Sequence, residues 1–283
     1  MDKLRDALCT TIHERLGWPS EAAAELAEYA HVVSYERSAT VFRAGEPSDL
    51  LYLLINGEVR LYYGNGAGSR LLVSIVRNGE LFGIAGLQTG EGRMPQPEQS
   101  LTACAAACSK VAVLVRARVA RLLQQLPSAD LLRICEHADS RWKALCHRLV
   151  AFMTQGVRSR LAYSIMEVAQ DFGIQDARGT LITLRLSHED FAEMIGASRP
   201  MVSKCINDLK QAKVFVKEGG RYIVQREDML ARMVGGVRRE EQLSGLISAL
   251  RSPGAQRPDR RLPIARQVEH RIGGAGDQAS AGW

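Results

Sequence analysis

The stretch SHEDFAEMIGASRPMVSKCINDLKQAK (187–213) predicts two short helices joined by a tight turn. Ser187 and Asp190 have the spacing of a capping box, in which a hydroxyl and a carboxylate accept from the free N–H groups at a helix start. The apolar residues that would share the buried face of this first helix are Phe191, Met194 and Ile195. Gly196 then suits the helix end, because glycine adopts positive φ without steric cost. The stretch is typical of a helix-turn-helix.

The second helix of this stretch has an apolar face and a basic face. Ser198 offers an N-cap oxygen, and Pro200 suits the first turn, where a missing N–H costs little. The residues expected to face inward are Met201, Val202, Cys205, Ile206 and Leu209. The residues left to point outward are Arg199, Ser203, Lys204 and Asn207. Such a face fits the major groove of DNA.

A β-hairpin is predicted directly after these helices, in VFVKEGGRYIVQ (214–225), with Gly219–Gly220 at its turn. We interpret it as the wing of a winged helix-turn-helix. Lys210, Lys213 and the wing residue Arg221 are expected to meet phosphates. An ordinary helical hairpin with a solvated charged face would also have two helices and a glycine corner. The cap, the basic helix and the following hairpin together favour DNA binding.

The composition fits two domains and a dispensable end. The chain has 283 residues, 46% of them hydrophobic, which is enough for real cores. Its net charge of +6 permits an anionic partner but indicates no specificity. We find no secretory signal and no apolar run that could span a bilayer, so the sequence predicts a cytoplasmic protein without a membrane partner. The six cysteines lack CxxC pairs and zinc-type spacing, and we interpret them as reduced thiols with no metal site.

The predicted fold class is α+β. Short alternating segments separated by glycine turns predict an antiparallel, jelly-roll-like β-roll, and Asn56–Gly57, Asn65–Gly66 and Asn78–Gly79 are hairpin signals. The expected parts in chain order are N-terminal helices (1–30, as 2–16 and 20–30), the β-roll (31–127), a dimerisation helix and hinge (128–156), a winged helix-turn-helix domain (157–230, opening with a helix at 157–173), and an extension (231–283). Helix-forming segments are expected around 227–250, and disorder from about 252.

The long helix expected at 128–154 carries an apolar stripe at alternating spacings of four and three. We call this stripe the seam, and its residues are Leu131, Cys135, Ala138, Trp142, Leu145, Leu149 and Phe152. A helix buried against its own domain would have the same stripe. We favour a homodimer interface, because a groove-reading helix usually works as one of a symmetric pair.

The order of roll, dimer helix, hinge and winged helix-turn-helix resembles the CRP/FNR superfamily of bacterial transcription regulators, across about residues 31–226. The matching segments are RSATVFRAGEPSDLLYLLINGEVRLYY (37–63), NGELFG (78–83), SRLA (159–162) and the helix-turn-helix. The resemblance implies a cyclic-nucleotide-binding-like sensor roll. It also implies a homodimer that binds a two-fold-symmetric DNA operator, contacts RNA polymerase and is not an enzyme.

The resemblance also implies a set of DNA-binding residues: Ser198, Arg199, Pro200, Ser203, Lys204, Asn207 and Arg221. Arg199 is expected to bind guanine O6 and N7 through both arms of its guanidinium. Many relatives have glutamate and arginine where this chain has Pro200 and Lys204, so the half-site sequence is expected to differ from theirs.

The ligand pocket implied by the resemblance has lost its ligand-binding groups. Gly83-Ile84-Ala85-Gly86 stands where cyclic-AMP-responsive members have Gly-Glu-Leu-Gly, so Ile84 replaces the ribose carboxylate. Gln99-Ser100 stands where an Arg-Ser pair meets the phosphate, and Leu145 and Cys146 replace the pair that reads adenine. Standard cyclic-AMP binding is therefore disfavoured, and the cofactor is unknown.

Other sensor types and other functions remain open at this stage. An iron–sulfur cluster needs grouped N-terminal cysteines, and Cys9 stands alone, so none is expected. A thiol switch at Cys135, Cys146 or Cys205, a different ligand near the insertion TGEGRMPQPEQ (89–99), and constitutive activity are alternatives. So is a ligand-binding or scaffolding protein whose helix-turn-helix only packs. An enzyme regulated by the roll is disfavoured, since we find no nucleophile–base pair.

Overall fold

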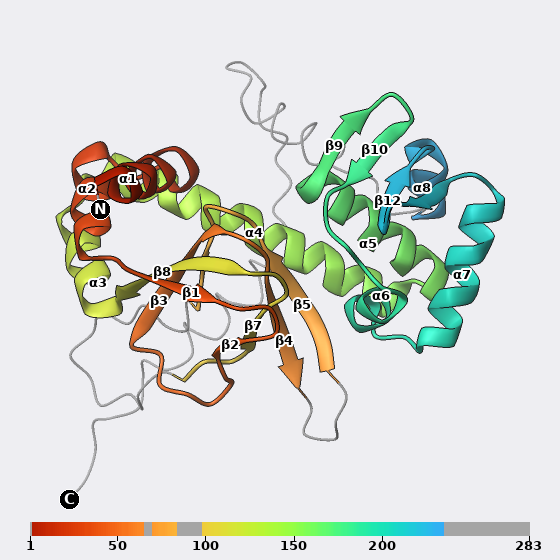
Figure 1. Cartoon of the computed structure of the whole chain (residues 1–283), viewed down its shortest axis with the longest axis horizontal. Coiled ribbons are helices and arrows are strands. Elements are labelled where there is room, and N and C mark those ends of the chain that lie inside the picture. The colour runs from red at the N-terminus through yellow and green to blue at the C-terminus, as the bar shows by residue number, and fades with distance from the viewer. Residues whose placement is uncertain (1, 65–69, 84–97, 235–283) are drawn as a thin grey trace, which may run out of the picture. The chain divides into compact units, whose positions relative to one another are not determined.

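The computed structural model describes residues 2–64, 70–83 and 98–234, and most of their elements are labelled in Figure 1. The helices are α1 (Asp2–Leu16), α2 (Ser20–Tyr29), α3 (Arg116–Gln125), α4 (Ser128–Thr154), α5 (Val157–Phe172), α6 (His188–Ile195), α7 (Arg199–Gln211) and α8 (Glu227–Met233). The helices expected at 2–16, 20–30, 128–154 and 157–173 are thus present as α1, α2, α4 and α5. Of the helices in the described ranges, none is both long and apolar enough to cross a membrane.

The strands fall into two groups, which confirms the mixed α+β class. The first group is β1 (His31–Tyr35), β2 (Thr40–Phe42), β3 (Leu50–Asn56), β4 (Val59–Gly64), β5 (Arg70–Val76), β6 (Leu81–Phe82), β7 (Thr102–Ala105) and β8 (Ser109–Val115). The second group is β9 (Gly173–Asp176), β10 (Gly179–Ile182), β11 (Phe215–Glu218) and β12 (Arg221–Val224). The first eight strands form the N-terminal roll. The last four belong to the part that the sequence predicts to bind DNA, residues 157–234, which we call the DNA-binding part.

The roll consists of two antiparallel four-stranded sheets that face each other. Their strand orders are β1-β8-β3-β6 and β2-β7-β4-β5. Side chains that alternate along the strands fill the space between the sheets, because successive residues of a strand point to opposite faces. An aromatic group lies in this core: the ring centroids of Phe42 and Tyr52 are 4.9 Å apart, and those of Tyr52 and Phe82 are 5.4 Å apart.

Two of the three predicted hairpins in the roll are wrong. Asn56–Gly57 connects β3 to β4, and Asn78–Gly79 connects β5 to β6, but in each case the two strands lie in different sheets. Both glycines have positive φ, so the local turn was correctly predicted. The pairing was not, because which strands pair depends on distant contacts. The strands on either side of Asn65–Gly66 do pair, although that turn itself lies outside the described residues.

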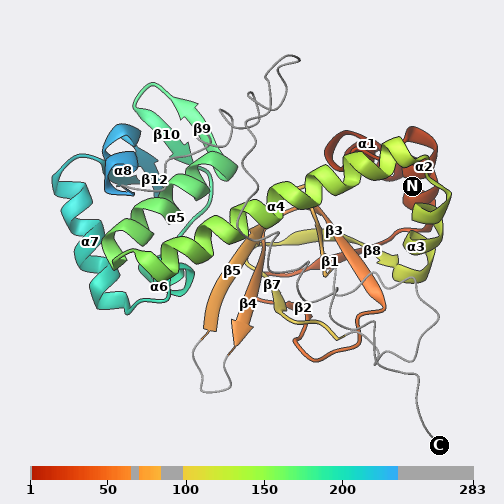
Figure 2. The same cartoon turned by 180° about the vertical axis from the view of Figure 1, so that it is seen from behind.

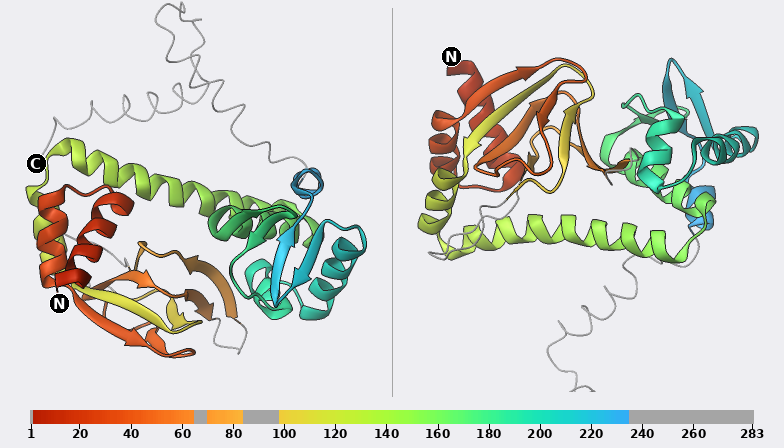
Figure 3. Two further views of the ribbon diagram at one scale, coloured as in Figure 1. Left: turned by 45° about the horizontal axis from the view of Figure 1, so that its top comes forward. Right: turned by 90° about the horizontal axis from the view of Figure 1, so that it is seen from below.

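The N-terminal helices and α3 cover one sheet of the roll, as Figure 3 shows. Leu8 and Ile12 of α1 pack with Leu26 of α2 against Leu53 and Leu114 of the sheet β1-β8-β3-β6. The sequence did not indicate α3, which follows β8 directly. Its Val119 and Leu122 complete this core.

Helix α4 connects the roll to the DNA-binding part (Figure 2). Most of its predicted seam is exposed. Trp142 is 64% exposed, and Cys135, Leu145 and Leu149 are also exposed. Leu131 and Phe152 are half-buried, and the side chain of Ala138 lies outside the described set. Packing within one chain therefore leaves much of the apolar surface of the seam uncovered.

The DNA-binding part has a sheet of order β11-β12-β10-β9 packed against α5, α6, α7 and α8. The sequence did not predict the hairpin of β9 and β10. It predicted helical structure after residue 227, which α8 provides; the chain from 235, with its expected disorder, lies outside the described residues. Tyr62, Leu72 and Ile75, from β4 and β5 of the roll, belong to the same buried cluster as these elements.

Candidate nucleic-acid interface

Helix α6 begins and ends as its sequence predicts. The Ser187 hydroxyl accepts from the backbone N–H of Asp190 at 3.1 Å, and the Asp190 carboxylate accepts from the backbone N–H of Ser187 at 2.7 Å. The helix ends at Gly196, whose φ of 58° and ψ of 48° are left-handed. The predicted buried face is also confirmed: Phe191, Met194 and Ile195 are buried. The first half of the helix-turn-helix is thus fixed by local signals.

Helix α7 differs from the prediction at two residues. The Ser198 side chain makes no capping hydrogen bond, so its role as a side-chain cap is wrong. Pro200 does lie in the first turn. Met201 was expected inside but is 50% exposed, because the turn between the helices leaves the first turn of α7 outside the core. The core contacts come from later in the helix: Val202, Ile206 and Leu209 are buried, and Cys205 is half-buried against them.

The polar face of α7 is exposed, as predicted, with one exception. Arg199, Pro200, Lys204 and Asn207 lie in solvent. Ser203 is half-buried, and its hydroxyl lies 2.7 Å from Nδ1 of His188, the first residue of α6. Burial, and then the positive charges of Lys210, Lys217 and Arg199, lower the pKa of His188. This contact couples the two helices across the turn and was not predicted from the sequence.

The wing is held to the helix-turn-helix by aromatic packing. Gly219 and Gly220 both have positive φ at the turn between β11 and β12, as the hairpin signal predicted. Phe215 of β11 stacks on Tyr222 of β12 with ring centroids 4.3 Å apart. The edge of each ring then meets Phe191 of α6. The wing is therefore a fixed neighbour of α6.

The basic side chains on the wing are partly engaged within the protein. Nε of Arg221 donates to the carbonyl of Thr183 at 2.9 Å, while the residue stays exposed. Arg178, between β9 and β10, pairs with Asp176 and with Glu218 of the wing. These two arginines line one groove together with Glu218. Arg178 is a basic residue of this surface that the sequence analysis missed, because the β9–β10 hairpin was not predicted.

The ligand pocket expected in the roll is only partly described. Gly83 has a φ of 73°, and Ile84, Ala85 and Gly86 lie outside the described residues. Gln99 is buried, and its amide nitrogen donates to the Ser48 hydroxyl at 3.2 Å and to the Gly83 carbonyl at 3.4 Å. Ser100 next to it is exposed. Gln99, which the resemblance places where cyclic-AMP-responsive members have a phosphate-binding arginine, is thus hydrogen-bonded within the protein.

The other expected pocket residues lie on α4. Leu145 is exposed and Cys146 is half-buried. Within the described part of the chain, neither side chain shares a buried cluster with Gly83 or Gln99.

Comparison with known proteins identifies both halves of the chain. A model of the cyclic nucleotide-binding domain matches residues 32–126, and a model of the Crp-like helix-turn-helix domain matches residues 159–233. The global nitrogen regulator of Nostoc sp. is 27% identical over 201 residues, which are 71% of this chain and 88% of that protein. The CRP-like cAMP-activated global transcriptional regulator of Mycobacterium tuberculosis is 27% identical over 218 residues, which are 76% and 93% of the two chains.

Solved structures share the fold. FixK2 from Bradyrhizobium japonicum superposes with a TM-score of 0.63 at 17% identity, covering 74% of this chain and 98% of that one. The c-di-GMP responsive global regulator CLP of Xanthomonas campestris gives a TM-score of 0.61 at 19% identity, covering 73% and 99%. The relatives named here are transcription regulators and not enzymes.

Proposed function

The chain belongs to the CRP/FNR superfamily of transcription regulators, and we propose that it binds a two-fold-symmetric DNA operator as a homodimer. The observation that carries this proposal is the exposed basic face of α7, which lies beside a wing in a capped helix-turn-helix. A recognition helix of this kind reads base edges, while its neighbours bind phosphates and fix the register.

Within this face, Arg199 binds guanine and Lys204 and Asn207 read or flank the neighbouring bases. Arg199 is exposed at the start of α7, where recognition helices contact bases. Ser198, Pro200 and Ser203 complete the contact surface, with Ser203 oriented by His188. Lys210, Lys213 and Arg221 bind phosphates. Proline has no acceptor for a cytosine amine, so Pro200 makes the half-site differ from that of relatives with glutamate.

The homodimer forms through the seam of α4. Its exposed members include Trp142, Leu145 and Leu149, which a second copy of the helix would cover. A contiguous apolar stripe of this size on a long helix is typical of a protein interface. Two-fold symmetry then presents two copies of α7 to successive major grooves, and RNA polymerase is the further partner that this function implies.

Selection of bound DNA from a random pool tests the proposal, with purified, reduced protein and no added effector. The expected result is an enriched site of two inverted half-sites about one helical turn apart. Enrichment of unrelated single sites, or none under any effector or redox condition, would contradict recognition by a symmetric dimer. In that case the helix-turn-helix would have only a packing role.

The roll does not bind cyclic AMP in the standard way in this proposal, although the Mycobacterium tuberculosis relative is named as cAMP-activated. Gln99 supports this, because it carries no charge for a phosphate and its amide is already bonded to Ser48 and Gly83. Calorimetric titration with cyclic AMP is expected to give no saturable heat. Micromolar binding would overturn this part of the proposal. A thiol switch stays the second candidate. Its sites would be the exposed Cys135 and the half-buried Cys146 on α4, and the half-buried Cys205 on α7.

A further inference from the structure

The first four residues of strand β4, residues 59–62, are buried on both faces of the strand. Val59 and Leu61 point into the roll core, and Tyr62, on the opposite face, packs with the elements of the DNA-binding part. Arg60 alternates with Val59 and Leu61 and shares that opposite face. It is only 7% exposed, which is rare for an arginine unless it is paired. The roll therefore presents a buried cation to the DNA-binding part.

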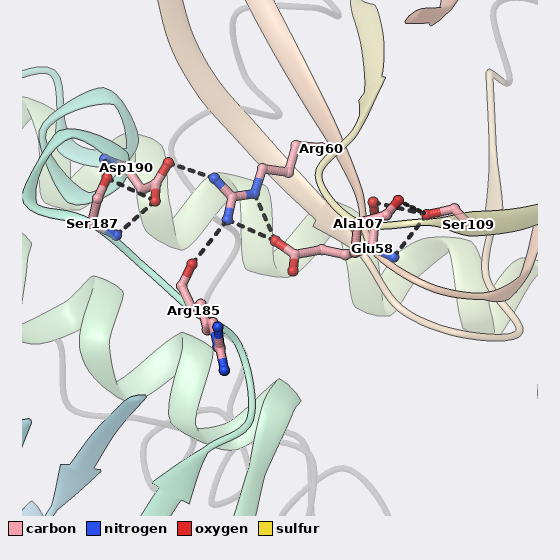
Figure 4. Close-up of polar contacts among 7 residues, drawn as sticks. All are labelled: Glu58, Arg60, Ala107, Ser109, Arg185, Ser187 and Asp190. Atoms are coloured by element: carbon pink, nitrogen blue, oxygen red, sulfur yellow. Dashed lines mark hydrogen bonds and ion pairs between the residues drawn. The ribbon is translucent and has the colours of Figure 1, made fainter. Parts of the chain in front are cut away.

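The Arg60 guanidinium joins two parts of the chain that are 130 residues apart, as Figure 4 shows. Its Nε donates to the Glu58 carboxylate at 2.7 Å, and its Nη1 donates to the Asp190 carboxylate of α6. Its Nη2 lies 2.7 Å from the same Glu58 oxygen and 3.4 Å from the carbonyl of Arg185. Arg60 thus holds both ends of the segment 185–190, which leads into the helix-turn-helix.

The carboxylate of Asp190 has two roles at once. It accepts from the backbone N–H and hydroxyl of Ser187, which completes the capping box, and it also pairs with Arg60. Burial alone lowers the pKa of Arg60. The negative charges of Glu58 and Asp190 together raise that pKa by more than burial lowers it, so the net shift is upward. The guanidinium stays charged, and the start of α6 is bonded to the roll.

The roll side of this contact is fixed as well. The backbone N–H of Glu58 donates to the Ser109 hydroxyl at 3.1 Å, and that hydroxyl donates to the Ala107 carbonyl at 2.7 Å. At Gly57, with a φ of 120°, an added Cβ would lie 2.3 Å from the Ser109 oxygen. The turn therefore closes tightly on β8, and Glu58 is presented to Arg60 from a rigid corner.

We propose that Arg60 is a positioning residue for DNA binding, which fixes the helix-turn-helix against strand β4 so that each subunit presents its reading helix in one orientation. This inference rests on the proposed recognition of a symmetric operator by a homodimer. Two half-sites on one duplex are engaged together only if both reading helices are held at the required spacing. Orienting them in advance removes an ordering cost from the second binding event.

The test compares a full operator with a single half-site, using the operator that the selection provides, at low ionic strength where both bind measurably. The variants are Arg60→Met and the double variant Glu58→Gln with Arg60→Met, which leaves no unpaired Glu58 charge if the single variant folds poorly. Arg60→Lys keeps the charge without the two-armed geometry. Arg43→Met is the matched control, because Arg43 is an exposed arginine of the roll that pairs with nearby Glu46.

Positioning predicts that both Met variants lose affinity for the full operator by at least about tenfold and for the half-site by less than about twofold. The affinity of Arg60→Lys for the full operator is expected to lie between that of the Met variants and that of the unmodified protein. Arg43→Met is expected to change the affinities for the full operator and the half-site slightly and to the same extent. Equal losses on both DNAs, unchanged affinity, or a gain on the full operator would each overturn the positioning role. A full operator that the unmodified protein itself does not bind would instead overturn the proposed function, and this role with it.

Discussion

Arg199 is exposed at the first turn of α7, and its guanidinium has the geometry to read a base through two hydrogen bonds. Replacing it by alanine is expected to cost roughly 1–3 kcal/mol of operator binding and to relax the preference at one base pair. Binding measured on operators with each base at that position would show the relaxation. Lys213→Ala is the control, because loss of a phosphate contact weakens all sequences alike. If Arg199→Ala gives that uniform loss, the assigned docking of α7 is wrong.

His188 has a pKa below its ordinary value of 6.5, because burial and three nearby cations oppose its charged form. Below about pH 6.5 the unfolded chain binds this proton more readily than the folded chain, so its contribution to stability is present above that pH and is lost as the pH falls. The wild type is therefore expected to lose stability from about pH 7.5 to about 5.5 more steeply than His188→Gln. Denaturant titrations at several pH values measure this. Parallel curves for the two proteins would exclude the effect.

The start of α6 depends on a local signal, its capping box. Ser187 and Ser198, the residues that precede α6 and α7, allow a paired test of it. Ser187 completes a capping box, whereas the Ser198 side chain caps nothing at the start of α7. Ser187→Ala is expected to lower the free energy of unfolding by about 1 kcal/mol, and Ser198→Ala by much less. The midpoints of urea denaturation compare them directly. Equal losses would mean that the capping box adds nothing beyond an ordinary serine.

Elements with local signals could be predicted from the sequence, and those that depend on distant partners could not. The capping box, Gly196 and the Gly219–Gly220 turn each act within a few residues, and all three are present. Asn56–Gly57 turns the chain as predicted but joins two different sheets. The contact of Arg60 with Asp190 could not be predicted from the sequence, because the two residues are 130 positions apart and an arginine in a strand normally faces water. Ser198 and Met201 were misplaced because the exit angle of a helical turn depends on tertiary packing.

At the scale of the whole molecule, the proposed dimer depends on α4. Leu149 is 59% exposed in the seam, and an aspartate there would place a charge in the interface without disturbing the core of one chain. Leu149→Asp is expected to give a folded monomer in sedimentation analysis and to lose affinity for the full operator. Leu132→Asp is the control, since Leu132 is an exposed leucine of the same helix outside the seam. A dimer that survives Leu149→Asp would place the interface elsewhere.

The shared cluster of Tyr62, Leu72 and Ile75 with the elements after the hinge has a consequence for transplanting this module. The sequence suggests Gly156 as a domain boundary. A cut there would expose these three residues to solvent on the roll fragment, and their apolar neighbours on the DNA-binding fragment. A chimera that joins α5–α8 to a foreign sensor therefore needs a compatible β4 and β5, including a cation opposite Asp190. The segment that must be transferred together for DNA binding therefore includes β4 and β5 of the roll, on the N-terminal side of the hinge.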